Sequence, residues 1–157
     1  MKVGIEPLLK IGKIAEEKSC FSWVRQNHIK NEKGQELEFY NHSFLIDIYD
    51  DWTSIQTIRK ASQIGYSVMQ ILKSFWAAQY KNFNQIYTLP TFSDVGQFVP
   101  SKVNALISQN PILQQWTQDK DTILQKKIGN SFIYYRGTVS RSKEDEQMMG
   151  GVGTMFS

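Results

Sequence analysis

The stretch Ile55-Gln56-Thr57-Ile58-Arg59-Lys60-Ala61-Ser62-Gln63-Ile64-Gly65-Tyr66-Ser67-Val68-Met69 decides how the rest of the chain is interpreted. Its β-branched beginning is typical of a strand, and the residues from Ser67 onward are typical of a helix. A glycine lies between the two. Strand, turn and helix in this order are the setting of a phosphate-binding loop, so we predict a phosphate site at residues 60–67.

The match to the standard loop, G-x-x-x-x-G-K-[ST], is partial. Gly65 takes the place of the second glycine and Ser67 that of the Ser/Thr, whereas Lys60 stands at the first glycine and Tyr66 at the lysine. The physical requirements are still met. Gly65 allows close approach of the backbone, the helix N-terminus supplies N–H groups, and a flexible lysine supplies the cation. The alternative interpretation is an ordinary strand–turn–helix junction.

Composition limits the classes of protein that remain. The chain has 157 residues, 41% of them hydrophobic and 21% charged, which suits one globular domain. The single cysteine excludes an internal disulfide framework and fits a reducing cytoplasm. One cysteine and two histidines also argue against a structural zinc site. A net charge of +3 permits contact with nucleic acid without arguing for it. No run approaches the roughly 20 apolar residues of a membrane span, and we see no signal peptide.

The part before the loop has weaker patterns. Residues 1–35 are interpreted as an N-terminal arm that includes a short helix. A strand is predicted at 21–25, a turn at 31–35, a returning strand at 37–39 and a helical segment at 44–52.

The part after the loop alternates helix and strand. A helix follows from Ser67, and a strand at 86–90 ends at Pro90. Ser93 is the expected N-cap of the next helix, which Pro100 kinks or splits. Strand-like runs at 122–128 and 131–137 flank Gly129-Asn130 and predict a β-hairpin.

This order favours an α/β fold with a parallel pairing of residues 55–60 and 86–90. Ligands then bind beyond the carboxyl ends of the strands, which Lys60 and Pro90 mark. The predicted loop lies at that position.

Several segments together resemble the large terminase subunits of tailed phages, the ATP-driven DNA-packaging motors. Lys60 to Ser67 resembles their deviant Walker A, in which the lysine often begins the loop. Residues 86–91 resemble the next ATPase strand, 108–113 the following turn, and 128–137 the subsequent hairpin. Residues 39–51 lie where the family carries an adenine-side segment. The likeness covers about residues 36–140, which we interpret as a partial P-loop NTPase-like domain, with 141–157 as a poorly ordered tail.

The resemblance implies ATP and Mg²⁺ as cofactors. It implies that Lys60 contacts the β- and γ-phosphates, that the backbone around Gly65 supplies amides, and that Ser67 binds Mg²⁺. Gln63 stands where the family often has an arginine. The implied binding set is Lys60, Ala61, Ser62, Gln63, Ile64, Gly65, Tyr66 and Ser67, with Lys60 as the catalytic residue and Ser67 as the metal ligand.

The family also implies partners: double-stranded viral DNA, a small terminase subunit, a portal protein and further copies of the motor subunit, all in the host cytoplasm and without a membrane. The acidic strand end that activates water in the family is missing here, because no apolar strand precedes Lys143-Glu144-Asp145-Glu146. The nuclease carboxylates are missing too. We therefore expect ATP binding with slow hydrolysis or none.

Two other interpretations remain open. One is a helicase-like P-loop fragment, which shares the strand–turn–helix pattern. The other is a non-catalytic interaction module whose tryptophans and other aromatic residues, 13% of the chain, form a binding surface.

Overall fold

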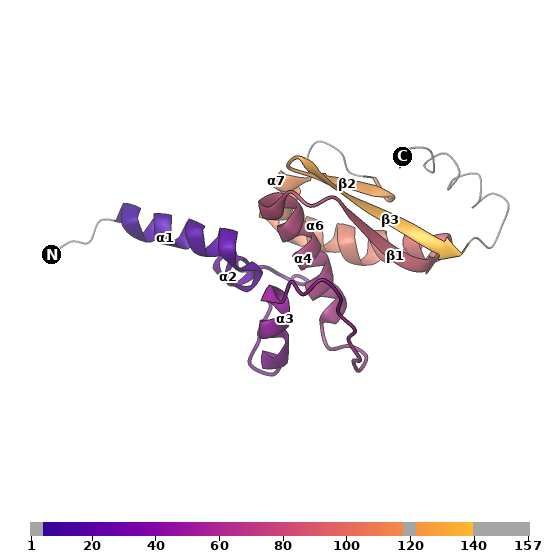
Figure 1. The fold of residues 1–157 in the computed structure, drawn as a ribbon, viewed down its shortest axis with the longest axis horizontal. Coiled ribbons are helices and arrows are strands. Elements are labelled where there is room, and N and C mark those ends of the chain that lie inside the picture. Colours follow the sequence, from indigo (N-terminus) through magenta and orange to yellow (C-terminus); the bar gives the residue numbers. More distant parts are fainter. Residues whose placement is uncertain (1–4, 118–121, 140–157) are drawn as a thin grey trace.

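The computed structural model describes residues 5–117 and 122–139, and it is a mixed α/β structure (Figure 1). Three strands form one sheet in the order β1-β3-β2. The helices α4 and α6 lie against one side of this sheet, while helix α1 extends away from the rest of the molecule. The elements are α1 (Ile5–Lys18), α2 (Cys20–Gln26), the 3₁₀ turn η1 (Ser43–Leu45), α3 (Ile46–Asp50), α4 (Tyr66–Lys81), β1 (Gln85–Thr91), α5 (Phe92–Phe98), the π-helix η2 (Val99–Asn104), α6 (Ala105–Gln109), α7 (Pro111–Trp116), β2 (Gln125–Ile128) and β3 (Ser131–Val139).

Helix α4 is the centre of the core and confirms the helix predicted from Ser67. Every residue from Ser74 to Ala78 is buried, as are Val68, Met69, Ile71 and Leu72. A helix that is buried on most of its surface must be surrounded by other elements. Both flanking residues, Gly65 at φ 79° and Asn82 at φ 54°, have left-handed backbones, which stop the helix sharply at each end.

The sheet confirms part of the predicted pattern. Strand β1 matches the strand expected at 86–90, and β2 and β3 form the expected hairpin, with Gly129 at φ 55° in its turn. β1 pairs in parallel with β3, with Thr88 beside Arg136. At Gly137 the junction of β1 with α5 comes so close to β3 that a Cβ there would lie 2.3 Å from the backbone nitrogen of Phe92.

The strand predicted at 55–60 is wrong, and so is its predicted parallel pairing with 86–90. Residues 51–61 have no regular structure before the turn at 62–65, and the side chain of Ile55 is 87% exposed. The carboxylate of Asp51 accepts hydrogen bonds from the backbone and hydroxyl of Thr53, and Gln56 donates to the Asp51 carbonyl. These local bonds turn the chain where a strand would extend it.

The strand predicted at 21–25 is also wrong, because these residues belong to α2. Ser19 caps this helix through a bond from the backbone of Ser22, and the Asp50 carboxylate accepts a hydrogen bond from the Cys20 N–H at 2.7 Å. A cap and an acidic group at the N-terminus favour a helix over the β propensity of the sequence.

The return strand predicted at 37–39 does not form; the only pairing in this region of the described chain is an isolated bridge between Lys30 and Glu36. The side chain of Asn110 holds the segment in place. It accepts from the Lys30 N–H at 2.8 Å and donates to the Lys30 carbonyl at 2.9 Å.

Helix α5 begins two residues earlier than expected. Thr91, not Ser93, is its N-cap, and Thr91 and Asp94 form a reciprocal capping box. Pro100 splits the predicted long helix by converting its middle into the π-helix η2. A proline removes one helical hydrogen bond, and the wider π turn accommodates that loss.

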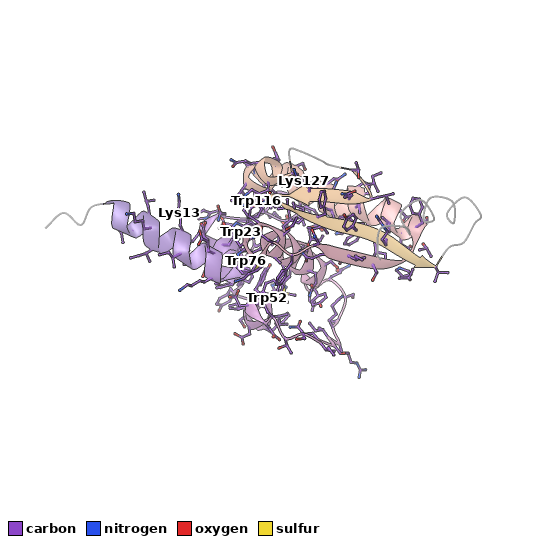
Figure 2. All side chains as sticks on the ribbon, turned by 45° about the horizontal axis from the view of Figure 1, so that its top comes forward. Lys13, Trp23, Trp52, Trp76, Trp116 and Lys127 are labelled. Atoms are coloured by element: carbon purple, nitrogen blue, oxygen red, sulfur yellow. The ribbon has the colours of Figure 1, made fainter. Side chains whose placement is uncertain are left out.

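Four tryptophans and one tyrosine form a continuous row through the molecule, and Figure 2 shows the four tryptophans following one another. Trp52 stacks on Trp76 at 5.2 Å between ring centroids, and Trp23 stacks on Trp116 at 5.1 Å. Tyr80 joins the two pairs, at 5.8 Å from Trp76 and 5.7 Å from Trp116. The row packs the N-terminal helices onto α4. The tail expected at 141–157 lies outside the described residues.

Candidate phosphate-binding cavity at the N-terminus of α4

A cavity of about 630 Å³ opens at the N-terminal end of α4. Three parts of the chain line it: the segment 31–49, the loop before α4 with the first turn of that helix, and Lys102 from η2. The lining residues from the loop and helix are Lys60, Gln63, Ile64, Gly65, Tyr66, Ser67 and Val68. Six of the eight residues predicted for a phosphate site therefore meet at one cavity, whereas Ala61 and Ser62 do not line it.

The first turn of α4 offers backbone N–H groups at this cavity. No side chain caps the helix, and the first bond across its N-terminus runs from the Met69 N–H to the Gly65 carbonyl at 3.0 Å. The N–H groups of Tyr66, Ser67 and Val68 precede that bond, as the first donors of every helix do. A helix of 16 residues also carries partial positive charge at this end.

The loop before the helix has an unusual backbone. Gln63 at φ 60° and Gly65 at φ 79° are both left-handed. Gly65 takes up this conformation at little cost, but Gln63 is strained by it. Such backbone geometry often occurs where a loop curls around a ligand.

Lys60 lies beside the first helical turn although it precedes the helix by six residues. Its ammonium is 5.8 Å from the centroid of the Tyr66 ring and 3.4 Å from the Ala61 carbonyl. The Tyr66 hydroxyl accepts a hydrogen bond from Gln70 at 2.7 Å, which holds the ring in position. The curled loop thus brings a mobile cation to the same cavity as the first turn of α4.

Aromatic and apolar side chains also line the cavity, and they come from the segment 31–49. Phe39, His42, Leu45 and Tyr49 line it, and the first three lie before or within η1. Phe39 and Tyr49 pack edge to face at 5.7 Å. The same segment also contributes the charged side chains of Glu32, Lys33, Glu36 and Glu38, so this part of the lining mixes aromatic and charged groups.

Lys102 is a lining residue that the sequence does not reveal. It forms an ion pair with Glu32, which is 70 residues away in the chain. Partial burial is the largest single effect and acts to raise the pKa of Glu32, but the hydrogen bond from Lys102, a backbone hydrogen bond and the charges of Lys102 and Lys33 together lower it. Only the packing of η2 against the loop 31–35 brings the two together, so no local sequence signal predicts the pair.

A second cavity, of about 330 Å³, lies between β1, α4 and residues 51–56. Lys73, buried within α4, reaches its wall and donates to the carbonyls of Ile48 at 2.7 Å and Asp51 at 2.8 Å. Desolvation lowers the pKa of Lys73 despite three nearby acidic groups. The two bonds close the C-terminal end of α3, so this lysine has a structural role.

The donor set fits phosphate better than it fits a bare metal ion. No cluster of three or more His, Cys, Asp or Glu side chains suited to a metal occurs among the described residues. Ser67 is the one predicted metal ligand. A magnesium ion that keeps most of its waters and binds substrate phosphates needs few protein ligands.

None of the helices in the described ranges is long and apolar enough to cross a bilayer. In comparisons with known proteins, the chain matches no family model, no curated protein and no solved structure.

Proposed function

We propose that this chain binds ATP with Mg²⁺ in the cavity at the N-terminus of α4, as the ATP-binding part of a DNA-packaging motor of the terminase type. One observation supports this most: Lys60, Gln63, Gly65, Tyr66 and Ser67 line a single cavity together with the uncapped end of a long helix. Fixed N–H donors, a helix dipole and a lysine are the groups that bind polyphosphates.

Each group has a separate role in the proposed complex. The N–H groups of the first turn of α4 donate to phosphate oxygens, and Gly65 keeps the approach free of a Cβ atom. Lys60 swings from the Tyr66 ring toward the outer phosphates, and the Ser67 hydroxyl is a ligand of the ion. Bound Mg²⁺ neutralises phosphate charge. The base lies against Phe39 and Tyr49, which also line the cavity.

Hydrolysis needs a carboxylate that orients water beside the outer phosphate. Of the acidic side chains that line the cavity, Glu32 is paired with Lys102, and Glu36 with His28 at 2.8 Å. Glu38 is exposed. We therefore expect binding with slow turnover or none. In the proposed motor, a second element supplies the missing carboxylate, and the partners are double-stranded viral DNA, the small subunit and the portal in the host cytoplasm.

Calorimetric titration with a non-hydrolysable ATP analogue and Mg²⁺ tests the proposal. Lys60→Ala should weaken binding about tenfold or more, since hydrogen bonds to charged groups contribute roughly 1.5–3 kcal/mol. Arg59→Ala is the matched control: it removes a neighbouring exposed cation that does not line the cavity. No saturable binding by the folded chain, or equal losses in both variants, would overturn the proposal.

A second candidate function is a non-catalytic interaction module, and helix α1 favours it. Leu8, Leu9, Ile11 and Ile14 on this helix are 51–64% exposed. Exposed apolar clusters of this kind occur at protein contacts. Light scattering distinguishes the two functions, because an interaction module associates through α1 whether or not ATP is present.

A further inference from the structure

The structure brings together two residues that have exchanged places in the phosphate-binding loop. Tyr66 stands where the standard loop, G-x-x-x-x-G-K-[ST], has its lysine, and Lys60 stands where that loop has its first glycine. The Lys60 ammonium nevertheless lies 5.8 Å from the centroid of the Tyr66 ring, and both residues line the cavity at the N-terminus of α4. The charge of the missing loop lysine is therefore present beside its usual residue position, supplied from the other end of the loop.

The Tyr66 ring is a fixed surface. It packs against the hydrophobic core from the first turn of α4. Its hydroxyl accepts a hydrogen bond from Nε2 of Gln70 at 2.7 Å. Residues four apart lie next to each other on a helix surface, so α4 itself brings these two side chains together. The core holds one part of the ring, and Gln70 holds its hydroxyl end.

Lys60, in contrast, belongs to a segment that does not fix its side chain. It is exposed and lies within residues 51–61, which have no regular structure. Within the described ranges two contacts hold its ammonium: the Tyr66 ring and, at 3.4 Å, the Ala61 carbonyl. Ala61 is the next residue and moves with the loop, so the ring is the contact that ties the ammonium to α4. An exposed cation–π contact favours the held position about two- to fivefold.

The position of this ammonium suits an anionic ligand. A helix N-terminus carries partial positive charge, so a lysine beside it is unfavourable unless the negative face of a ring or a bound anion offsets that charge. An ammonium has three N–H donors, and the ring and the Ala61 carbonyl leave a donor for a phosphate oxygen. Lys60 therefore reaches the outer phosphates of a bound nucleotide by a short movement from the ring.

We propose that Tyr66 and Gln70 are positioning residues for Lys60 in the nucleotide site. The ring, held by Gln70, keeps the ammonium beside the first turn of α4 before the ligand arrives, so that less side-chain freedom is lost on binding. In a standard loop the covalent position of the lysine has this effect. The inference rests on the proposed binding of ATP, and it explains how a loop with a displaced lysine still presents a cation to phosphate.

NMR of the chain without nucleotide tests the positioning directly. A ring shields protons that lie over its face, so the ε-CH₂ resonance of Lys60 should lie upfield of that of Lys33, an exposed lysine on the turn 31–35. Tyr66→Phe keeps the ring and should keep the shift, whereas Tyr66→Leu should remove it. Gln70→Leu should reduce the shift, because the ring loses its hydrogen bond. The native measurement needs no variant, so a substitution that impairs folding leaves it intact.

Calorimetric titration with the non-hydrolysable ATP analogue and Mg²⁺ tests the consequence for binding. Tyr66→Leu should weaken the affinity about two- to fivefold, and Tyr66→Phe should recover most of that loss. Phe83→Leu is the matched control, because it removes an exposed ring beyond the opposite end of α4 and should leave the affinity unchanged. The double variant Lys60→Gly with Tyr66→Lys restores the standard motif, and it should recover the affinity that Lys60→Ala loses.

Four results would each overturn the inference: a Lys60 resonance without the shift, a shift that Tyr66→Leu leaves in place, equal affinities of the native chain and Tyr66→Leu, or a folded double variant that binds no better than Lys60→Ala. The first two are measured without nucleotide, and the proposed ATP site stands if the native chain still binds the analogue. A native chain that shows the shift but binds no analogue would overturn the proposed function, and with it the role of Tyr66.

Discussion

Lys73→Met should destabilise the chain by removing one cation from the centre of the fold. In the native structure the ammonium donates to the carbonyls of Ile48 and Asp51 and lies 4.7 Å from the centroid of the Trp52 ring. Methionine preserves most of the buried stem, so the change isolates the polar head. The two carbonyls at the end of α3 then lose their partner.

The magnitude follows from these contacts. A hydrogen bond to a charged group contributes about 1.5–3 kcal/mol, and a partly exposed cation–π contact about 0.5–1 kcal/mol. Water reaches Asp51, which is exposed, and replaces part of the loss. Removal of the ammonium also relieves its desolvation, the same effect that lowers the pKa of Lys73. The net expectation is a decrease of about 2–3 kcal/mol in the free energy of unfolding, measured by urea denaturation.

Lys81→Met is the matched control on the same helix. Lys81 also lies over a tryptophan, with its ammonium 5.2 Å from the Trp76 ring centroid, but it is exposed. Its replacement should cost less than about 0.5 kcal/mol. Equal effects of the two substitutions would refute the argument that the carbonyl bonds of Lys73 hold α3 against α4.

Three further predictions concern other parts of the fold. Gly137→Ala should lower the free energy of unfolding in urea by about 3 kcal/mol or more, since its Cβ would lie 2.5 Å from the Thr91 carbonyl carbon. Gly96→Ala is the control: no atom lies within 4 Å of its new Cβ, so it should stabilise α5 by about 0.5–1 kcal/mol. A neutral Gly137→Ala would contradict the close approach. Burial, and to a smaller extent the nearby Asp50, raises the pKa of the Cys20 thiol. A disulfide reagent at neutral pH should therefore modify this buried cysteine only when the chain unfolds. Rapid labelling of the native chain would show that Cys20 is accessible to the reagent and would contradict this prediction. The pKa of Glu32 is lowered in the folded state, so the stabilisation by its ion pair with Lys102 is fully present above the ordinary carboxyl pKa of about 4.3 and is lost as the pH falls through the folded pKa. Glu32→Gln should therefore lower the free energy of unfolding by less than about 1 kcal/mol, and only at pH values where Glu32 is ionised. A pH profile of stability that Glu32→Gln leaves unchanged would show that the pair contributes nothing.

Sequence patterns predict the elements whose local signals agree with their surroundings. Helix α4 has apolar residues at helical spacing, and the hairpin at Gly129-Asn130 has strong turn residues between strand-like runs. Both were predictable for these reasons. The strand predicted at 55–60 does not form, because Asp51 and Thr53 make local hydrogen bonds that outweigh the β propensity of the β-branched residues.

The strand predicted at 21–25 is wrong for a long-range reason, because α2 forms there. Phe21 and Trp23 favour a strand locally, but the carboxylate that stabilises the start of the helix belongs to Asp50, 30 residues beyond Cys20. The lining of the cavity is likewise only partly predictable from the sequence. The phosphate-loop half of the cavity is visible as a run from Lys60 to Ser67, while Lys102 reaches it only through the tertiary packing of η2.

Amide chemical shifts measure most directly whether the cavity at the N-terminus of α4 binds a nucleoside triphosphate. The chain is small enough for assignment by NMR, and the non-hydrolysable ATP analogue with Mg²⁺ is added in steps. If the cavity binds the analogue, saturable shifts are centred on the backbone amides of Gln63, Gly65, Tyr66, Ser67 and Val68. Shifts that are absent at saturating analogue, or that centre on another part of the chain, would contradict it.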